Sequence, residues 1–233
     1  MSTVLVIGAS RGIGLEFVRQ YVADGAKVIA TARDDAGLQR LKALGAKALR
    51  VDVAEPASIS GLAWLLDGEE IDLALYVAGV FSQGDALTPP TREAFDQAMR
   101  TNVLGAMQAI PQVAPMVEAA RSGGGRKGRF VFISSAMAKI GGVENSRGWV
   151  YRASKAALNM AVASAQHDYP GAILVALSPG WVQTDMGGEG APLTAAQSVA
   201  SMRQTISGLG PQHKGAFLDH DGTRFATWYL TCF

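Results

Sequence analysis

Tyr151 and Lys155 are four positions apart in W-V-Y-R-A-S-K-A-A-L, a spacing that places a phenol and an ammonium on one face of a helix. An ordinary tyrosine has a pKa of about 10, and a neighbouring cation lowers that pKa by favouring the phenolate. The pair therefore has the composition of a general acid–base centre that exchanges a proton with an oxygen. Ser134 and Ser135 precede it in F-V-F-I-S-S. Because Y-x-x-x-K spacings also arise by chance on exposed helices, the interpretation depends on the rest of the chain.

The N-terminal segment T-V-L-V-I-G-A-S-R-G-I-G-L-E-F-V is typical of a nucleotide-binding turn. An apolar strand pattern leads through Gly8, Gly12 and Gly14 into a helical pattern. Glycines let the backbone approach a pyrophosphate, whose charge is stabilised by the free N–H groups and positive dipole at the start of the following helix. A purely structural glycine turn is the alternative. The position between a strand and a helix favours dinucleotide binding.

Apolar runs and helical patterns alternate along the chain. The predicted strands are residues 4–7, 27–31, 48–51, 73–77, 129–133, 173–177 and 216–218, and the predicted helices are residues 12–24, 36–44, 57–66, 91–120, 150–168 and 195–207. This alternation implies a parallel sheet, and runs that are apolar at nearly every position indicate that helices cover both of its faces. The sequence therefore predicts an α/β protein with a three-layer, doubly wound Rossmann-type fold and a mostly parallel seven-stranded sheet, as a single domain over residues 1–233.

The composition argues against several classes of function. With 21 basic and 20 acidic residues, the net charge of +1 makes nucleic-acid binding unexpected. The chain begins without a charged leader and has no apolar run of membrane-spanning length, so we expect a cytoplasmic protein that does not contact membranes. Cys232 is the only cysteine and cannot form an internal disulfide. His167, His213 and His220 lack ligand spacing, so no metal site is expected.

Two prolines fall within the fourth helical pattern. Pro111 and Pro115 predict a kink, or a fresh helical start after Asn102. A local irregularity there would free a backbone carbonyl to hold water. An ordinary buried helix asparagine is the alternative for Asn102.

The end of the second predicted strand, V-I-A-T-A-R-D-D, favours NADP(H) over NAD(H). A fold that prefers NAD places a carboxylate about 20 residues past the glycine loop, on the ribose 2′-hydroxyl. Here Arg33 follows the strand, where its guanidinium would bind a 2′-phosphate, and Arg11 would reach the same phosphate from the glycine loop. The competing interpretation places Asp34 or Asp35 on the ribose and leaves both arginines in solvent.

Over nearly its whole length the chain resembles the short-chain dehydrogenase/reductase superfamily. G-A-S-R-G-I-G resembles the cofactor loop of that family, and P-G-W-V-Q-T resembles the segment that grips nicotinamide. The resemblance implies a catalytic set of Asn102, Ser135, Tyr151 and Lys155. Together with the argument on the two arginines, it implies that the cofactor contacts Gly8, Ser10, Arg11, Gly12, Ile13, Gly14, Arg33, Asp52, Val53, Ala78, Gly79, Tyr151, Lys155, Pro179, Gly180, Val182, Thr184 and Met186.

The interval from Ser135 to Tyr151 indicates one branch of this superfamily. It spans 16 positions, longer than the spacing most common in the family, because of extra residues in G-G-V-E-N-S-R-G-W. With R-A-S-K-A-A-L-N-M and P-G-W-V-Q-T-D-M-G-G, this interval makes the chain similar to the C-factor and Sniffer-type carbonyl reductase branch. One departure is Tyr76-Val77, where the family usually has paired asparagines, and it removes their side-chain hydrogen bonds.

The resemblance implies an NADPH-dependent oxidoreductase that reduces a ketone or aldehyde, with Tyr151 as the acid and Ser135 as a donor to the substrate oxygen. Lys155 would lower the pKa of the tyrosine and bond the ribose, and Asn102 would hold a water. Side chains alternate faces along a strand, so only one of Ser134 and Ser135 is expected to face the nicotinamide, and the family alignment selects Ser135.

Bulky apolar residues in the flanking segments favour a hydrophobic substrate, although each is also compatible with the core. They are Met137, Val143, Trp149, Trp181 and Met186. The alternative function is a non-catalytic NADPH-binding signalling or sensor protein of the C-factor type. Because helices of this family commonly pack between subunits, the resemblance also implies a homo-oligomer, either a dimer or a tetramer.

Overall fold

The computed structural model describes residues 2–122 and 126–226, so Cys232 lies outside the described residues. Seven strands form one sheet in the order β11-β8-β7-β4-β1-β2-β3, and all neighbouring pairs are parallel. These strands are β1 (Thr3–Ile7), β2 (Lys27–Ala32), β3 (Lys47–Arg50), β4 (Leu73–Tyr76), β7 (Arg129–Ile133), β8 (Ile173–Leu177) and β11 (Phe217–Leu218). The predicted single-domain, doubly wound α/β fold is confirmed.

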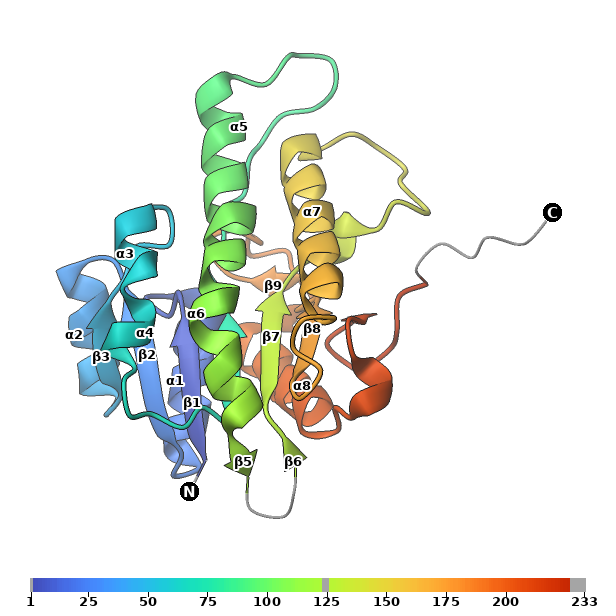
Figure 1. The fold of residues 1–233 in the computed structure, drawn as a ribbon. Helices are drawn as coiled ribbons and strands as arrows, with labels where there is room; N and C mark the ends of the chain where they lie inside the picture. The colour runs from blue at the N-terminus through green and yellow to red at the C-terminus, as the bar shows by residue number, and fades with distance from the viewer. Residues whose placement is uncertain (1, 123–125, 227–233) are drawn as a thin grey trace.

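Helices cover both faces of the sheet (Figure 1). One face packs against α1 (Gly12–Ala23), α2 (Asp35–Ala43) and α8 (Ala195–Ser207). The other packs against α3 (Pro56–Ser60), α4 (Leu62–Leu65), α6 (Gly105–Ala119) and α7 (Trp149–Ala165). Strand β1 shows why its run is apolar throughout, since Val4 and Val6 enter the first core while Leu5 and Ile7 enter the second.

The fourth helical pattern, predicted over 91–120, is three elements. It begins as α5 (Arg92–Met99), widens into the π-helical turn η1 (Arg100–Leu104) and continues as α6. Pro111 and Pro115 do not end the helix, because both lie inside α6. They are four positions apart on its exposed face, where solvent reaches the carbonyl groups that lose a partner. The predicted fresh start after Asn102 is correct, since α6 begins at Gly105.

Shorter elements complete the described chain. The single helix predicted over 57–66 is divided between α3 and α4 at Gly61. Two small sheets pair β5 (Arg121–Ser122) with β6 (Arg126–Lys127) and β9 (Val182–Gln183) with β10 (Leu193–Thr194). Two 3-10 turns are η2 (Ala136–Ala138) and η3 (Pro211–His213). No helix among the described residues is long and apolar enough to span a membrane, and they contain no cluster of metal-binding side chains.

The topology places the candidate site at one edge of the sheet. The chain order reverses at β1, which lies between β2 and β4. In open parallel sheets, ligands bind outside the carboxyl ends of the strands at such a switch point. The glycine loop, the A-G pair and the S-S pair follow the carboxyl ends of β1, β4 and β7, respectively, so they meet at this edge.

Candidate active site

Tyr151 and Lys155 lie in the first two turns of α7, and both are buried, with exposed fractions of 6% and 3%. The Lys155 ammonium lies 5.8 Å from the centroid of the Tyr151 ring. It donates a hydrogen bond of 2.8 Å to the carbonyl of Ile133 at the end of β7. The helix therefore presents the two groups together at the carboxyl edge of the sheet, as their spacing predicted.

Burial shifts the pKa values of both groups. It raises the pKa of the Tyr151 phenol above its ordinary value, and a hydrogen bond with the Ser135 side chain opposes that rise. Burial also lowers the pKa of Lys155 from 10.5 to about 8. The expected lowering of the tyrosine pKa by Lys155 is not found in this structure, where desolvation of the phenol is the larger effect.

The two serines after β7 interact with different partners. Ser134 is buried, and its hydroxyl donates a hydrogen bond of 2.6 Å to Asn159 Oδ1 on α7. Ser135 is half-buried, its side chain opposes the rise of the Tyr151 pKa, and its hydroxyl accepts a hydrogen bond of 3.1 Å from the Met137 N–H. Alternation along the strand end thus places only Ser135 beside the phenol.

Asn102 lies in the π-helical turn η1 and is fully buried. Its Oδ1 accepts a hydrogen bond of 2.8 Å from the Val80 N–H, and its Nδ2 donates bonds of 2.9 Å to the Val80 carbonyl and the Ser154 hydroxyl. Ser154 in turn donates a bond of 2.8 Å to the Tyr151 carbonyl. Sequence reasoning missed Ser154, although its position beside Lys155 in the same helix was a usable signal.

Tyr76 shows how the departure from the paired asparagines is accommodated. Its ring is fully buried and stacks near Phe132, with 6.0 Å between centroids. Its hydroxyl donates a hydrogen bond of 2.8 Å to the carbonyl of Thr101, the residue before Asn102. The phenol therefore ties the end of β4 to the π-helical turn.

Gly79 packs directly between two of the catalytic candidates. A Cβ atom placed on this residue would lie 3.3 Å from Asn102 Oδ1 and 3.3 Å from Lys155 Nζ. The absence of a side chain therefore lets η1, the β4 end and α7 approach one another. Asn102 and Lys155 thus lie on either side of Gly79, and Tyr151 lies beside Lys155.

The glycine loop is shaped for a close backbone approach. Gly8 has a φ of +87°, and a Cβ there would lie 2.6 Å from the Ala78 backbone. A Cβ on Gly14 would lie 2.3 Å from the Gly8 carbonyl oxygen. The loop opens α1, whose first N–H groups face the same edge. A dinucleotide pyrophosphate fits this cradle, in which side chains at these positions would clash.

The segment after β8 closes the other side of the cradle. Its Thr184 methyl group would lie 3.6 Å from a Cβ on Gly12. Arg11 pairs with Asp185 across 2.9 Å, and both side chains are exposed. The Ser198 hydroxyl donates a bond of 2.6 Å to the Pro179 carbonyl and anchors the segment to α8. Arg11 is therefore paired across the cleft in this structure, although the sequence placed it on a phosphate.

The acidic side chains after β2 are both engaged in local contacts. Asp34 caps α2 by accepting a hydrogen bond of 2.7 Å from the Gly37 N–H, and Asp35 pairs with Arg50. Arg33 is exposed. This arrangement argues against the competing interpretation in which Asp34 or Asp35 binds a ribose. The Asp52 carboxylate accepts a bond of 3.0 Å from the Ala54 N–H, and Val53 beside it is buried.

Phe81 is a further residue that sequence reasoning missed. Its ring lies 4.9 Å from the Tyr151 ring, between centroids. Of the apolar residues expected to flank the substrate, Val143 is 51%, Trp181 59% and Met186 47% exposed. These three side chains are therefore available at the surface and do not belong to the core.

Comparison with known proteins agrees with this geometry. Residues 2–192 match the sequence profile of the family described as short chain dehydrogenase. The C-signal protein of Myxococcus xanthus is 41% identical over 126 residues, covering 53% of this chain and 75% of its own. The solved structure of carbonyl reductase Sniffer of D. melanogaster superposes with a TM-score of 0.88 at 27% identity, covering 97% of this chain and 100% of that one. An NADPH-bound carbonyl reductase from chicken fatty liver superposes with a TM-score of 0.87 at 32% identity, covering 97% and 99%. The predicted resemblance to the Sniffer and C-factor branch is confirmed.

Proposed function

The chain belongs to the short chain dehydrogenase family, and on that premise we propose that it reduces a ketone or aldehyde to an alcohol with NADPH as the reductant. The observation that carries the proposal is the buried Tyr151 phenol beside the buried Lys155 ammonium, with the Ser135 side chain acting on the pKa of that phenol. The likeness to carbonyl reductases, one of them solved with NADPH bound, supports the same reaction class.

The Tyr151 phenol is available as a proton donor. Because burial keeps the phenol protonated at neutral pH, its Oη can give a proton to the oxygen of a carbonyl group as that oxygen gains negative charge. Ser135 Oγ, whose side chain lowers the pKa of the same phenol, would donate a hydrogen bond to the same oxygen. We assign the acid role to Tyr151 and the orienting role to Ser135.

Lys155 and Asn102 have supporting roles in this proposal. The Lys155 ammonium is fixed by the Ile133 carbonyl, and its lowered pKa of about 8 lets it exchange a proton near neutral pH. Asn102 has all its side-chain polar atoms engaged with Val80 and Ser154, so it acts here through the position of the backbone in η1. Its assigned role is to hold the turn against α7.

NADPH, when bound, supplies the hydride. Gly8, Gly12 and Gly14 would receive its pyrophosphate, and Arg33 would bind the 2′-phosphate. Arg11 would reach that phosphate after leaving Asp185. The remaining proposed contacts are Ser10, Ile13, Asp52, Val53, Ala78, Gly79, Tyr151, Lys155, Pro179, Gly180, Val182, Thr184 and Met186.

The test is NADPH oxidation, followed by absorbance with a panel of ketones and aldehydes, in wild type and in Tyr151→Phe. The variant keeps the ring and removes the proton, so turnover is expected to fall by about 100-fold or more while the dissociation constant for NADPH stays close to wild type. Tyr169→Phe, which lies just before the amino end of β8 and thus away from the carboxyl edge of the sheet, is the control and should retain turnover. Near wild-type turnover by Tyr151→Phe would exclude the proposed acid.

A second candidate is a signalling protein that binds NADPH without turning it over. The likeness to C-signal favours it, because the 41% identity over 126 residues exceeds the 27% and 32% identity to the two carbonyl reductase structures. The same assay separates the two candidates. Tight NADPH binding without oxidation by any ketone, aldehyde or quinone would support the signalling function. Assembly as a homo-oligomer remains a prediction.

A further inference from the structure

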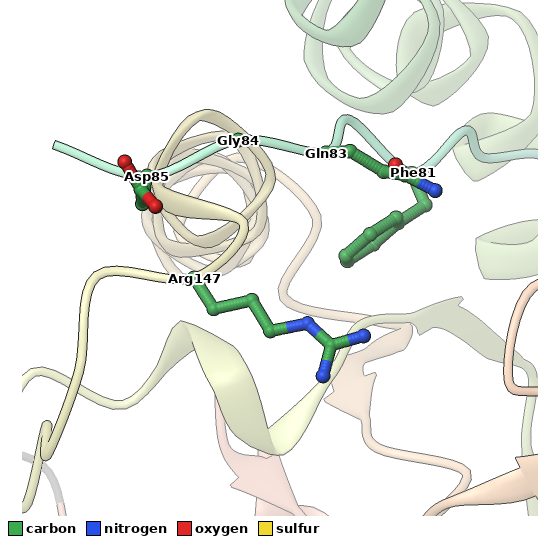
Figure 2. A pocket seen from close by; sticks show the side chains of 5 residues that line it. All are labelled: Phe81, Gln83, Gly84, Asp85 and Arg147. Atoms are coloured by element: carbon green, nitrogen blue, oxygen red, sulfur yellow. The ribbon is translucent and has the colours of Figure 1, made fainter. Parts of the chain in front are cut away.

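A cavity of about 320 Å³ lies beside the proposed acid. Phe81, Gln83, Gly84, Asp85 and Arg147 line it (Figure 2). The Phe81 ring packs against Tyr151, with 4.9 Å between centroids. A substrate whose carbonyl group reaches the Tyr151 phenol can therefore extend past Phe81 into this cavity.

Arg147 belongs to the extra residues that lengthen the interval between Ser135 and Tyr151. Its backbone is held by local hydrogen bonds. The Arg152 side chain donates a bond of 2.9 Å to the Arg147 carbonyl, and Asn145 Oδ1 accepts one of 3.1 Å from the Arg147 N–H. These bonds order the backbone of the inserted segment at this residue, which lowers the backbone entropy lost when Arg147 binds a ligand.

Two further bonds join the inserted segment to the loop that carries Phe81. The Gly148 N–H donates a bond of 2.7 Å to the Gly84 carbonyl, and the Ala86 N–H donates one of 3.2 Å to the Ser146 hydroxyl. The two walls of the cavity are therefore fixed relative to each other.

The cavity presents a cation without a carboxylate partner among residues 2–122 and 126–226. None of the ion pairs there includes Arg147. The other charged group of the cavity, the Asp85 carboxylate, accepts a bond of 3.0 Å from the Leu87 N–H. Figure 2 shows the Arg147 guanidinium extending toward the side of Phe81 and away from Asp85.

We infer that the substrate carries a carboxylate at the end remote from its carbonyl group, and that Arg147 binds this carboxylate. The inference rests on the proposed reductase function and names its substrate class. A planar guanidinium offers paired N–H donors that match the two oxygens of a carboxylate. Phe81, which contacts Tyr151 and lines the cavity with Arg147, provides an apolar contact for the part of the substrate that joins the two groups, so an aromatic aldehyde acid has a group for each of the three residues.

The experiment compares 4-carboxybenzaldehyde with its neutral methyl ester, methyl 4-formylbenzoate, as substrates for the full chain with NADPH. Wild type is expected to prefer the acid by about tenfold or more in kcat/KM, as a charge-assisted hydrogen bond would give. In Arg147→Met this preference should vanish through a rise in KM for the acid alone, and Arg147→Lys should restore part of it. Lys42→Met, which removes the same charge from the exposed surface of α2, should keep the preference. Equal preference in wild type and Arg147→Met would overturn the inference.

A binding measurement separates this inference from the reductase proposal. Terephthalate lacks a reducible aldehyde, so its binding in the presence of NADPH, measured by calorimetry, does not depend on turnover. Wild-type binding that falls about tenfold or more in Arg147→Met supports the anion site even if neither aldehyde is reduced, and in that case only the proposed reaction fails. Undetectable binding to wild type, or equal affinity in both proteins, excludes the anion site whether or not the aldehydes are turned over.

Discussion

Asn102 Nδ2 donates a hydrogen bond of 2.9 Å to the hydroxyl of Ser154, and both side chains are fully buried. Ser154 then donates to the Tyr151 carbonyl at 2.8 Å. The π-helical turn η1 is therefore fastened to the part of α7 that carries both Tyr151 and Lys155. The Ser154 hydroxyl bridges η1 and α7, the two elements of the proposed proton-transfer site.

Ser154→Ala is expected to lower the free energy of unfolding by about 1–3 kcal/mol, because it leaves a buried Asn102 N–H without its acceptor. Turnover should fall as well, since η1 loses its hold on α7. Ser164→Ala, on the exposed side of the same helix, should change neither quantity appreciably. Denaturant unfolding and the NADPH assay measure the two effects, and equal stability of the two variants would contradict the assignment.

Tyr76→Phe tests the link between β4 and η1. The variant keeps the stacked ring but leaves the Thr101 carbonyl without its donor, so a loss of about 1–2 kcal/mol in unfolding free energy is expected. Tyr169→Phe, which removes a hydroxyl from a partly exposed ring, is the control. If Tyr76→Phe unfolds at the same denaturant concentration as wild type, the bond to Thr101 contributes nothing to the fold.

Gly148→Ala and Gly142→Ala form a matched pair, because both glycines have positive φ angles, +66° and +76°. Each substitution should cost about 1–2 kcal/mol in backbone strain. Only a Cβ on Gly148 meets side chains, at 3.1 Å from the Phe81 ring and 3.2 Å from Met137 Cε. Gly148→Ala should therefore show the larger fall in Tm and also a raised KM for aldehydes. Equal KM values in the two variants would show that Phe81 does not contact the substrate.

Lys155→Met is expected to abolish turnover yet to stabilise the fold at pH 7 by about 1–3 kcal/mol, because it removes a charge that is costly to bury. The sign follows from the pKa, which burial lowers to about 8 from 10.5. As the pH rises between these values, the folded protein has released the proton while the unfolded chain retains it, so the wild type gains stability. The advantage of Lys155→Met should therefore shrink from pH 7 toward pH 10.5.

Urea unfolding at several pH values measures this trend. Lys42→Met, at an exposed position of α2, supplies the baseline and should show no comparable pH dependence. A stability difference between Lys155→Met and wild type that stays constant over that range would mean that Lys155 does not titrate there.

Arg33→Asp tests the proposed 2′-phosphate contact. Replacing the guanidinium by a carboxylate should raise the KM for NADPH by about tenfold or more and spare the KM for NADH, because only NADPH carries that phosphate. Lys42→Asp makes the same charge change on the exposed surface of α2 and is the control. An unchanged ratio of the two KM values in Arg33→Asp would remove Arg33 from the cofactor site.

The local patterns of the sequence were sufficient for the architecture. Strand β1 illustrates why: an apolar run with residues for two cores can only lie in a sheet covered on both faces. The glycine turn and the four-residue spacing of Tyr151 and Lys155 are also local, because strand-to-helix turns and helix faces are defined by neighbours in the chain. The sequence predicted an irregularity near Asn102 but attributed it to Pro111 and Pro115. The structure has it as the π-helical turn η1 at Arg100–Leu104, before either proline.

Contacts between distant segments were decided by the tertiary structure alone. From the sequence, Tyr76 indicated only that the hydrogen bonds of the usual asparagine are lost. The bond that replaces them could not be predicted, because its partner Thr101 is 25 positions away. The same holds for the pairing of Arg11 with Asp185, 174 positions apart, and for Phe81 against Tyr151.

The sequence by itself determined the fold and the types of group available for proton transfer, since these follow from periodicity and spacing within single elements. The tertiary structure decided which serine meets Tyr151 and that burial raises the phenol pKa. It also decided that Arg147 faces a cavity. Desolvation and the geometry of a cavity depend on which segments pack together, and the linear sequence does not contain those distances.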